Sequence, residues 1–157
     1  MVPNFLKIIW FAMLPIFELR LALPLAYFKY GFNIYESIGL SVLGNVLPLL
    51  PILYLLEGMV KFFSKWSFTK KFFDWFFKRT EKAFSETYMK WGKLGLIVFV
   101  GIPLPMTGAW TGAVASTLFK IKPKEAFWLL ILGVLLAAST VTTICLLFQN
   151  LATKWFL

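Results

Sequence analysis

The sequence predicts an all-α integral membrane protein in which two inverted repeats are joined by an amphipathic helical bridge. The first observation behind this fold class is composition. Hydrophobic residues make up 60% of the 157 residues and charged residues only 15%, whereas ordinary globular chains are about half apolar. The mean hydropathy is +0.79. Small domains leave much of their surface exposed, so the excess apolar surface is predicted to face lipid.

Long uncharged runs are the second observation. Residues 37–56 form a run of 20 without charge, residues 94–119 a run of 26, and residues 126–153 a run of 28. A helix needs about 20 apolar residues to cross a bilayer. An earlier apolar stretch carries Glu18 and Arg20 in its middle.

The third observation is the similar order of elements in the two halves. We treat residues 1–157 as a single membrane domain with an apolar half at 4–58, a basic aromatic bridge at 59–93 and a second apolar half at 94–153. Shifts of 88 and 89 residues align four pairs: Phe11 with Phe99, Pro15 with Pro103, Glu36 with Glu125, and Gly44 with Gly133. These matches favour an internal repeat.

The first half begins with an apolar stretch, 4–31, that is interrupted at Pro15 and Pro24. Proline lacks an N–H and clashes with the preceding helical turn. Unwound backbone survives in a membrane only where it lines a cavity or is buried in protein. We therefore expect a re-entrant hairpin over 4–31, followed by the span at 37–56. A kinked helix that crosses the membrane completely is the alternative.

The bridge carries nine of the sixteen Lys and Arg residues, between Lys61 and Lys93, interleaved with Phe, Trp and Tyr. Its apolar positions roughly follow a helical stripe at 59, 62/63, 66, 73, 76/77, 84 and 88. Such a helix suits the headgroup layer of an anionic membrane, and the positive-inside rule places it on the cytoplasmic side. A polar loop with incidental aromatics is the alternative. Because the net charge of +9 is concentrated here, we expect membrane lipids rather than nucleic acid as partners.

The second half repeats the plan of the first. Its apolar stretch at 94–121 is broken around Pro103, Pro105 and Gly112 and is followed by the uncharged run at 126–153. With re-entrant hairpins in both halves, 12 cationic residues lie on one side and 3 on the other. Four full spans would give 11 against 4, so the charge rule favours hairpins without deciding between them.

Glu18 and Arg20 are the most informative polar residues. A charge at membrane depth costs at least ~2.5–3.5 kcal/mol, so each is predicted to face a cavity or a partner. Residues two apart on a straight helix cannot pair, so either the helix is unwound or each charge has its own partner. Arg20 can grip phosphate or carboxylate with its planar fork. Glu18 is a candidate proton carrier, because burial favours the neutral carboxyl. A structural ion pair between the hairpins is the alternative.

Further candidate ligands come from the second hairpin and the first span. They are Thr107, Gly108, Trp110 and Thr111, together with Asn45 in the span at 37–56. Free amides at the start of a half-helix attract anions. Glycine and threonine at these spacings fit close helix packing equally well.

One cysteine and no histidine are present. Cys145 lies in the last apolar run and is expected to be a packed or lipid-facing residue. This composition excludes disulfides within the chain, Cys/His metal sites and nucleophile–histidine pairs. We therefore expect no metal, no cofactor and no enzymatic activity.

Two stretches, 17–24 (FELRLALP) and 103–112 (PLPMTGAWTG), resemble the small multidrug export protein family. The resemblance covers nearly the whole chain and implies a distant relationship to DedA and VTT-domain proteins. Those proteins are associated with paired re-entrant loops in inverted repeats and with lipid flipping or scrambling. By this resemblance, Glu18, Arg20 and Pro24 match the first loop element, and Pro103 and Pro105 match the second. The additional arginine of the DedA second loop is absent from residues 94–119.

Together these features predict a multi-pass, transporter-like protein of the cell (cytoplasmic) membrane. We expect a homodimer, because one short chain gives little wall around a pathway. The preferred function is movement of an anionic amphiphile, such as a phosphorylated lipid, between leaflets. Proton-coupled efflux of small drugs is the first alternative, and a non-transporting membrane scaffold is the second.

Overall fold

The computed structural model describes residues 3–63, 67–102 and 107–156. No described residue lies in a strand, so the predicted all-α class is confirmed. The helices are α1 (Asn4–Met13), α2 (Glu18–Pro24), the π-helical turn η1 (Leu25–Lys29), α3 (Ile34–Val46), α4 (Leu49–Phe63), α5 (Ser67–Trp91), the 3₁₀ turn η2 (Gly92–Leu94), α6 (Gly95–Gly101), α7 (Ala109–Leu118) and α8 (Pro123–Phe156).

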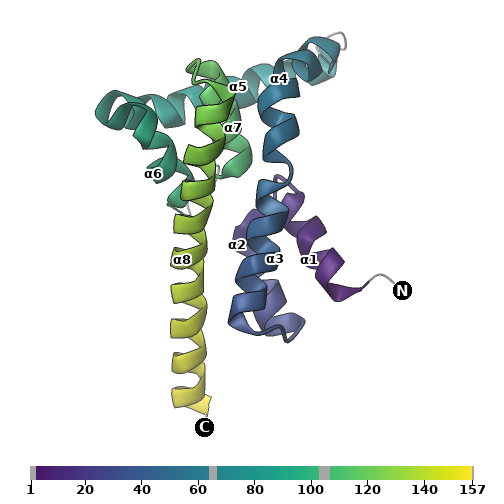
Figure 1. The fold of residues 1–157 in the computed structure, drawn as a ribbon, viewed down its shortest axis with the longest axis vertical. Coiled ribbons are helices and arrows are strands. Elements are labelled where there is room, and N and C mark those ends of the chain that lie inside the picture. The colour runs from purple at the N-terminus through teal and green to yellow at the C-terminus, as the bar shows by residue number, and fades with distance from the viewer. Residues whose placement is uncertain (1–2, 64–66, 103–106, 157) are drawn as a thin grey trace.

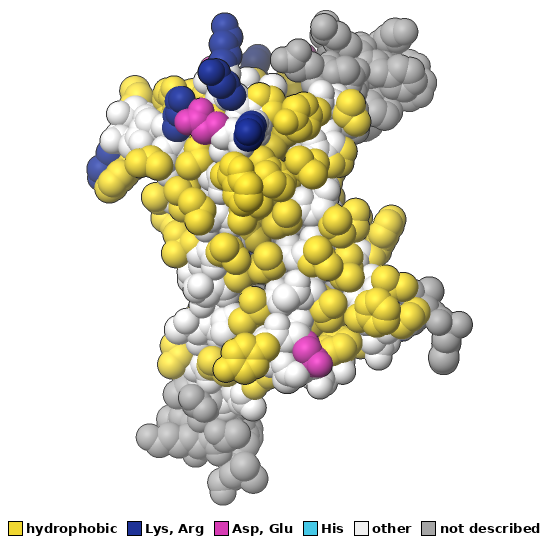
Figure 2. All heavy atoms as spheres, viewed as in Figure 1, with side chains coloured by type: hydrophobic (Ala, Val, Ile, Leu, Met, Phe, Trp, Pro, Cys, Tyr) yellow, Lys and Arg dark blue, Asp and Glu magenta, His cyan; other side chains and the backbone are white. Residues whose placement is uncertain are grey.

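Two helical stretches are long and apolar enough to cross a membrane. They are Ile34–Leu56, which comprises α3 and most of α4, and Pro123–Gln149 in α8. Large apolar side chains on their outer faces are solvent-exposed, among them Leu43, Tyr54, Trp128, Leu132, Ile144 and Leu147. On the face shown in Figure 2, hydrophobic side chains cover the middle and the charged ones lie toward the two ends. This distribution supports a membrane location.

The short helices form two pairs on either side of the long ones (Figure 1). The first pair, α1 and α2, packs against α3 at the lower end of the molecule. The second pair, α6 and α7, packs against α8 toward the upper end. Helix α5 runs across the top, where it contacts both α6 and α7.

Glycine determines how closely each pair approaches its long helix. A Cβ on Gly44 of α3 would lie 2.5 Å from the Ile9 carbonyl oxygen and 2.7 Å from the Ala12 Cβ. A Cβ on Gly133 of α8 would lie 2.7 Å from the Val100 Cβ and 3.2 Å from the Ile97 carbonyl oxygen. Small residues permit such close backbone contact between membrane helices. The two glycines therefore make the same kind of contact in the two halves.

The ends of the second helix of each pair also correspond. Gly31, after η1, has φ +70°, and Lys120, after α7, has φ +53°. Helix α3 then begins at Ile34 and α8 at Pro123. Gly31 and Lys120 are 89 residues apart, and so are Ile34 and Pro123. The same spacing separates Gly44 from Gly133.

Not every proline or glycine named as a break interrupts a helix. Pro15 lies in the turn between α1 and α2, but Pro24 lies inside a continuous helical segment. The following π-helical turn accommodates it, since local π-type turns re-satisfy groups that proline frees. Gly112 lies inside α7, where an added Cβ would come within 2.5 Å of Val100 Cγ2. Its role there is close packing. Pro103 and Pro105 fall outside the described residues.

The predicted bridge at 59–93 is divided between two helices, because α4 extends to Phe63 and α5 begins at Ser67. The later half of α5 is amphipathic, with Thr80 and Phe84 buried. Phe84 contacts Phe99 and Phe119 edge to face, at centroid distances of 5.1 and 5.0 Å. Part of the apolar face expected to meet lipid therefore packs on protein.

Candidate functional site

The turn between α1 and α2 meets the beginning of α7, far away in the sequence. Helix α1 ends at Met13, and the last carbonyls of a helix have no partner within it. The indole Nε1–H of Trp110 donates a hydrogen bond to the Met13 carbonyl at 3.0 Å. Trp110 thus joins the two helix pairs.

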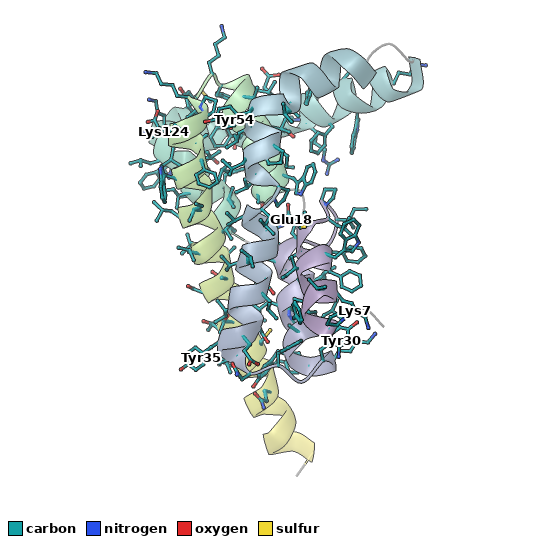
Figure 3. The ribbon with its side chains drawn as sticks, turned by 45° about the vertical axis from the view of Figure 1, so that its right-hand side comes forward. Lys7, Glu18, Tyr30, Tyr35, Tyr54 and Lys124 are labelled. Carbon is teal, nitrogen blue, oxygen red and sulfur yellow. The ribbon has the colours of Figure 1, made fainter. Side chains whose placement is uncertain are left out.

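Glu18 occupies the start of α2 and is buried, with 7% of its surface exposed. Its φ of +46° is uncommon for a residue other than glycine. The backbone N–H of Trp110 donates to Glu18 Oε1 at 3.3 Å. The first amides of a helix lack partners and form its positive end. The carboxylate of Glu18 therefore provides an anionic group to the N-terminus of α7 (Figure 3).

Gly108 provides the space that this carboxylate fills. A Cβ on Gly108 would lie 1.9 and 2.4 Å from the two Glu18 carboxylate oxygens. The φ of Gly108 is −149°, so any residue could adopt its backbone conformation. Glycine is therefore needed at position 108 because a larger residue would not fit beside Glu18. The backbone conformation does not require it.

Thr111 acts within its own helical turn. Its hydroxyl accepts a hydrogen bond from the Gly108 N–H at 2.7 Å and lies 3.1 Å from the Gly108 carbonyl oxygen. The hydroxyl is therefore engaged in capping α7.

Arg20 contacts the end of α6. Its Nη2 donates to the hydroxyl of Thr107 at 3.0 Å and to the carbonyl of Ile102 at 3.3 Å. The Thr107 hydroxyl donates in turn to Ile102 O at 2.9 Å. Since α6 ends at Gly101, the guanidinium lies at the negative end of that helix, where a cation is favourable.

The sequence left two possibilities for Glu18 and Arg20, an unwound helix or a separate partner for each charge. The structure has features of both. Helix α2 begins at Glu18 in a left-handed conformation, so no straight helix precedes it. Each charge also has its own partner, Glu18 at the beginning of α7 and Arg20 after the end of α6.

Six of the seven predicted ligands thus lie together: Glu18, Arg20, Thr107, Gly108, Trp110 and Thr111. Asn45 lies on the buried face of α3. Its Oδ1 and the Ser41 hydroxyl, one turn earlier, have no hydrogen-bond partner within the described residues. Sequence reasoning missed Ser41, although Ser37, Ser41 and Asn45 follow the i, i+4 spacing of one helix face.

Residues 18–140 match the family model described as "Putative small multi-drug export protein". The matched segment begins at Glu18 and includes Arg20, Thr107 and Trp110, whereas Met13 lies before it. No curated protein and no solved structure matches the chain.

Proposed function

The chain belongs to the small multi-drug export protein family, and from this we propose that it exports small cationic molecules across the cell membrane, coupled to protons. In this proposal Glu18 binds the proton and the cation alternately. The observation that carries it is the burial of the Glu18 carboxylate at the N-terminus of α7.

The charge of Glu18 favours a cationic over an anionic substrate at this position. The anion position at the start of α7 is already taken by a carboxylate of the chain itself. A substrate phosphate would have to displace it, whereas a proton or an organic cation would neutralise it. Hydrogen bonds to ionised groups are roughly twice as strong as neutral ones. Neutralising Glu18 would therefore weaken the contact between the two helix pairs, which provides a basis for coupling.

The lengths of the short helices support a re-entrant arrangement. Helices α1 and α7 have 10 residues each, and α6 has 7. At about 1.5 Å per residue, 10 residues extend only about 15 Å, half of the ~30 Å hydrocarbon core. Each pair would then enter and leave the membrane on one side. The matching contacts of Gly44 and Gly133 support an internal repeat. The two helix pairs lie toward opposite ends of the molecule, which favours an inverted repeat.

The membrane topology is tested by labelling. Single cysteines at Phe32 and Lys122, in a Cys145→Ser background, should react with an impermeant maleimide from opposite sides of the membrane. Each position follows the second helix of a pair, so opposite labelling is expected only if the pairs are inverted. Labelling of both from one side would establish four full spans instead.

Two further features belong to this proposal. The basic end of the molecule, which includes α5, would lie on the cytoplasmic side. A second copy would complete the wall around the pathway, and an apolar groove on the outer face of α1, lined by Leu6, Ile9 and Trp10, gives such a copy a place to pack.

Transport of a phosphorylated lipid is the second candidate function. The observation that favours it is the half-buried guanidinium of Arg20 at the same contact. Because guanidinium can bind phosphate through two parallel hydrogen bonds, Arg20→Lys distinguishes this candidate from cation export.

Proteoliposomes test the proposal with tetraphenylphosphonium as the probe and an imposed pH gradient as the driving force. We expect gradient-driven transport by the wild type, its loss in Glu18→Gln, and a mild effect of Arg20→Lys. Glu86→Gln, which removes an exposed carboxylate on α5, is the matched control and should transport normally. Melting temperatures in detergent establish that each variant is folded.

The opposite order of effects would favour the lipid candidate. If Arg20→Lys abolishes scrambling of a fluorescent phosphatidylglycerol while Glu18→Gln transports normally, cation export is wrong. If the folded wild type moves neither probe, the scaffold alternative replaces both transport functions.

A further inference from the structure

Two adjoining grooves lie at the basic end of the molecule, between α4 and the turn that joins α7 to α8. Their volumes are about 460 and 320 Å³. Both are lined by Thr117 and Lys120, so they form one continuous depression, which we call the α4–α7 groove. Each volume lies in the range typical of small-molecule sites, about 300–1,000 Å³.

The two ends of the α4–α7 groove differ in chemistry. One part is lined by Lys120, Lys122 and Tyr54, together with the apolar Leu53, Ile121 and Pro123. The other end is lined by apolar side chains, namely Leu56, Phe77, Val114 and Leu118. No carboxylate is among the described residues that line either part. The part with both lysines is therefore the more cationic one, and the other part is mainly apolar beside Lys120.

The position of the groove corresponds to the edge of the hydrocarbon layer. The first apolar stretch ends at Leu56 and the second begins at Pro123, and both residues line the groove. Figure 3 shows Tyr54 and Lys124 both at this end of the molecule. Tyrosine is typical of the membrane interface, and lysine there keeps its ammonium group in the headgroup layer.

We propose that the α4–α7 groove binds one anionic phospholipid from the leaflet at the basic end. Its phosphate lies at Lys120 and Lys122, and an acyl chain follows the apolar end past Leu118. Lys120 has φ +53°, whereas its counterpart Gly31 is a glycine, so the chain carries a long cationic side chain where glycine would fit the backbone better. The proposal is independent of the transported substrate and of Glu18.

Native mass spectrometry of the full chain tests this proposal, with phosphatidylglycerol and phosphatidylcholine as probes. The wild type should retain one phosphatidylglycerol and bind it at least tenfold more tightly than phosphatidylcholine. The double variant Lys120→Gln, Lys122→Gln should lose at least tenfold in affinity for phosphatidylglycerol. The matched control Lys90→Gln, Lys124→Gln removes the same charge at the same end, outside the groove, and should lose less than threefold.

A second variant separates loss of binding from loss of folding. Lys120→Gly suits the positive φ, so it should melt at or above the wild-type temperature and still bind phosphatidylglycerol more weakly. Leu118→Ser should weaken binding of long-chain phosphatidylglycerol while leaving a short-chain form almost unchanged. Equal losses in the groove and control double variants would overturn the proposal, because they would indicate general attraction to the surface. Equal affinity of the wild type for both lipids would overturn it as well.

Discussion

Gly108→Ala tests whether the contact between the helix pairs depends on the carboxylate of Glu18. The added methyl group would lie 1.9 and 2.4 Å from the two carboxylate oxygens, so the carboxylate must move. The backbone of Gly108 is extended and accepts alanine without strain. The effect of the substitution is therefore steric and confined to this contact.

The expected cost follows from the two interactions that are disturbed. Overpacking a close-packed site costs about 1–3 kcal/mol, and a displaced carboxylate also loses the hydrogen bond from the Trp110 N–H. A hydrogen bond to a charged group contributes about 1.5–3 kcal/mol. Added together, the two contributions give an expected loss of about 2.5–6 kcal/mol in the free energy of unfolding. At about 2–4 °C per kcal/mol for a chain of this size, the melting temperature should fall by several degrees.

Thermal unfolding of purified protein in detergent measures this cost, and Gly39→Ala is the matched control. Gly39 is helical, and a Cβ there meets nothing within 4 Å. This control should gain up to about 1 kcal/mol, because alanine favours a helix over glycine. A comparable melting temperature for Gly108→Ala and Gly39→Ala would refute the packing described here.

A double-mutant cycle then identifies Glu18 as the origin of the cost. Glu18→Gly removes the carboxylate and suits the φ of +46°, since glycine adopts this region freely. In that background Gly108→Ala should cost almost nothing, because its methyl group occupies the space left by the carboxylate. An unchanged cost would place the clash elsewhere and contradict the assigned contact.

Two other substitutions test the remaining contacts. Gly44→Ala and Gly133→Ala should each lower the free energy of unfolding by about 1–3 kcal/mol, because each added Cβ would lie within 2.7 Å of the first helix of its pair. The melting temperatures should fall by similar amounts, and a large effect at only one of the two glycines would argue against a repeat. Trp110→Phe should cost about 0.5–1.5 kcal/mol through loss of the hydrogen bond to the Met13 carbonyl, as measured by the same unfolding assay, and an unchanged melting temperature would contradict that bond.

Composition and hydrophobic pattern were sufficient to predict the helical class, because lipid requires internally satisfied backbone. The charged pair was also found from sequence, since Glu18 and Arg20 are out of place in an apolar stretch. The partners of these two residues could not be predicted. The partners lie between the end of α6 and the first turn of α7, 82 to 92 residues away, and sequence spacing carries no information about such contacts.

The helix breaks were predicted less well than the charged residues. Proline and glycine can interrupt a membrane helix, but they can also lie within one. Pro24 was expected to interrupt a helix, yet a π-helical turn absorbs its effect. Gly112 was expected to free the backbone, yet it brings α7 close to Val100 and Leu130. Which use applies depends on the neighbouring helix, and that neighbour is known only from the fold.

The two long apolar stretches differ in stiffness. The stretch at 34–56 is interrupted at residues 47 and 48, where α3 gives way to α4, and it contains Pro48 and Pro51. Helix α8 continues for 34 residues with no proline after Pro123. If the helix pairs rock against each other, bending would concentrate at the joint between α3 and α4 while α8 stays straight. One half would then contain the hinge and the other a rigid helix, so two halves of similar plan would have unequal mechanical roles.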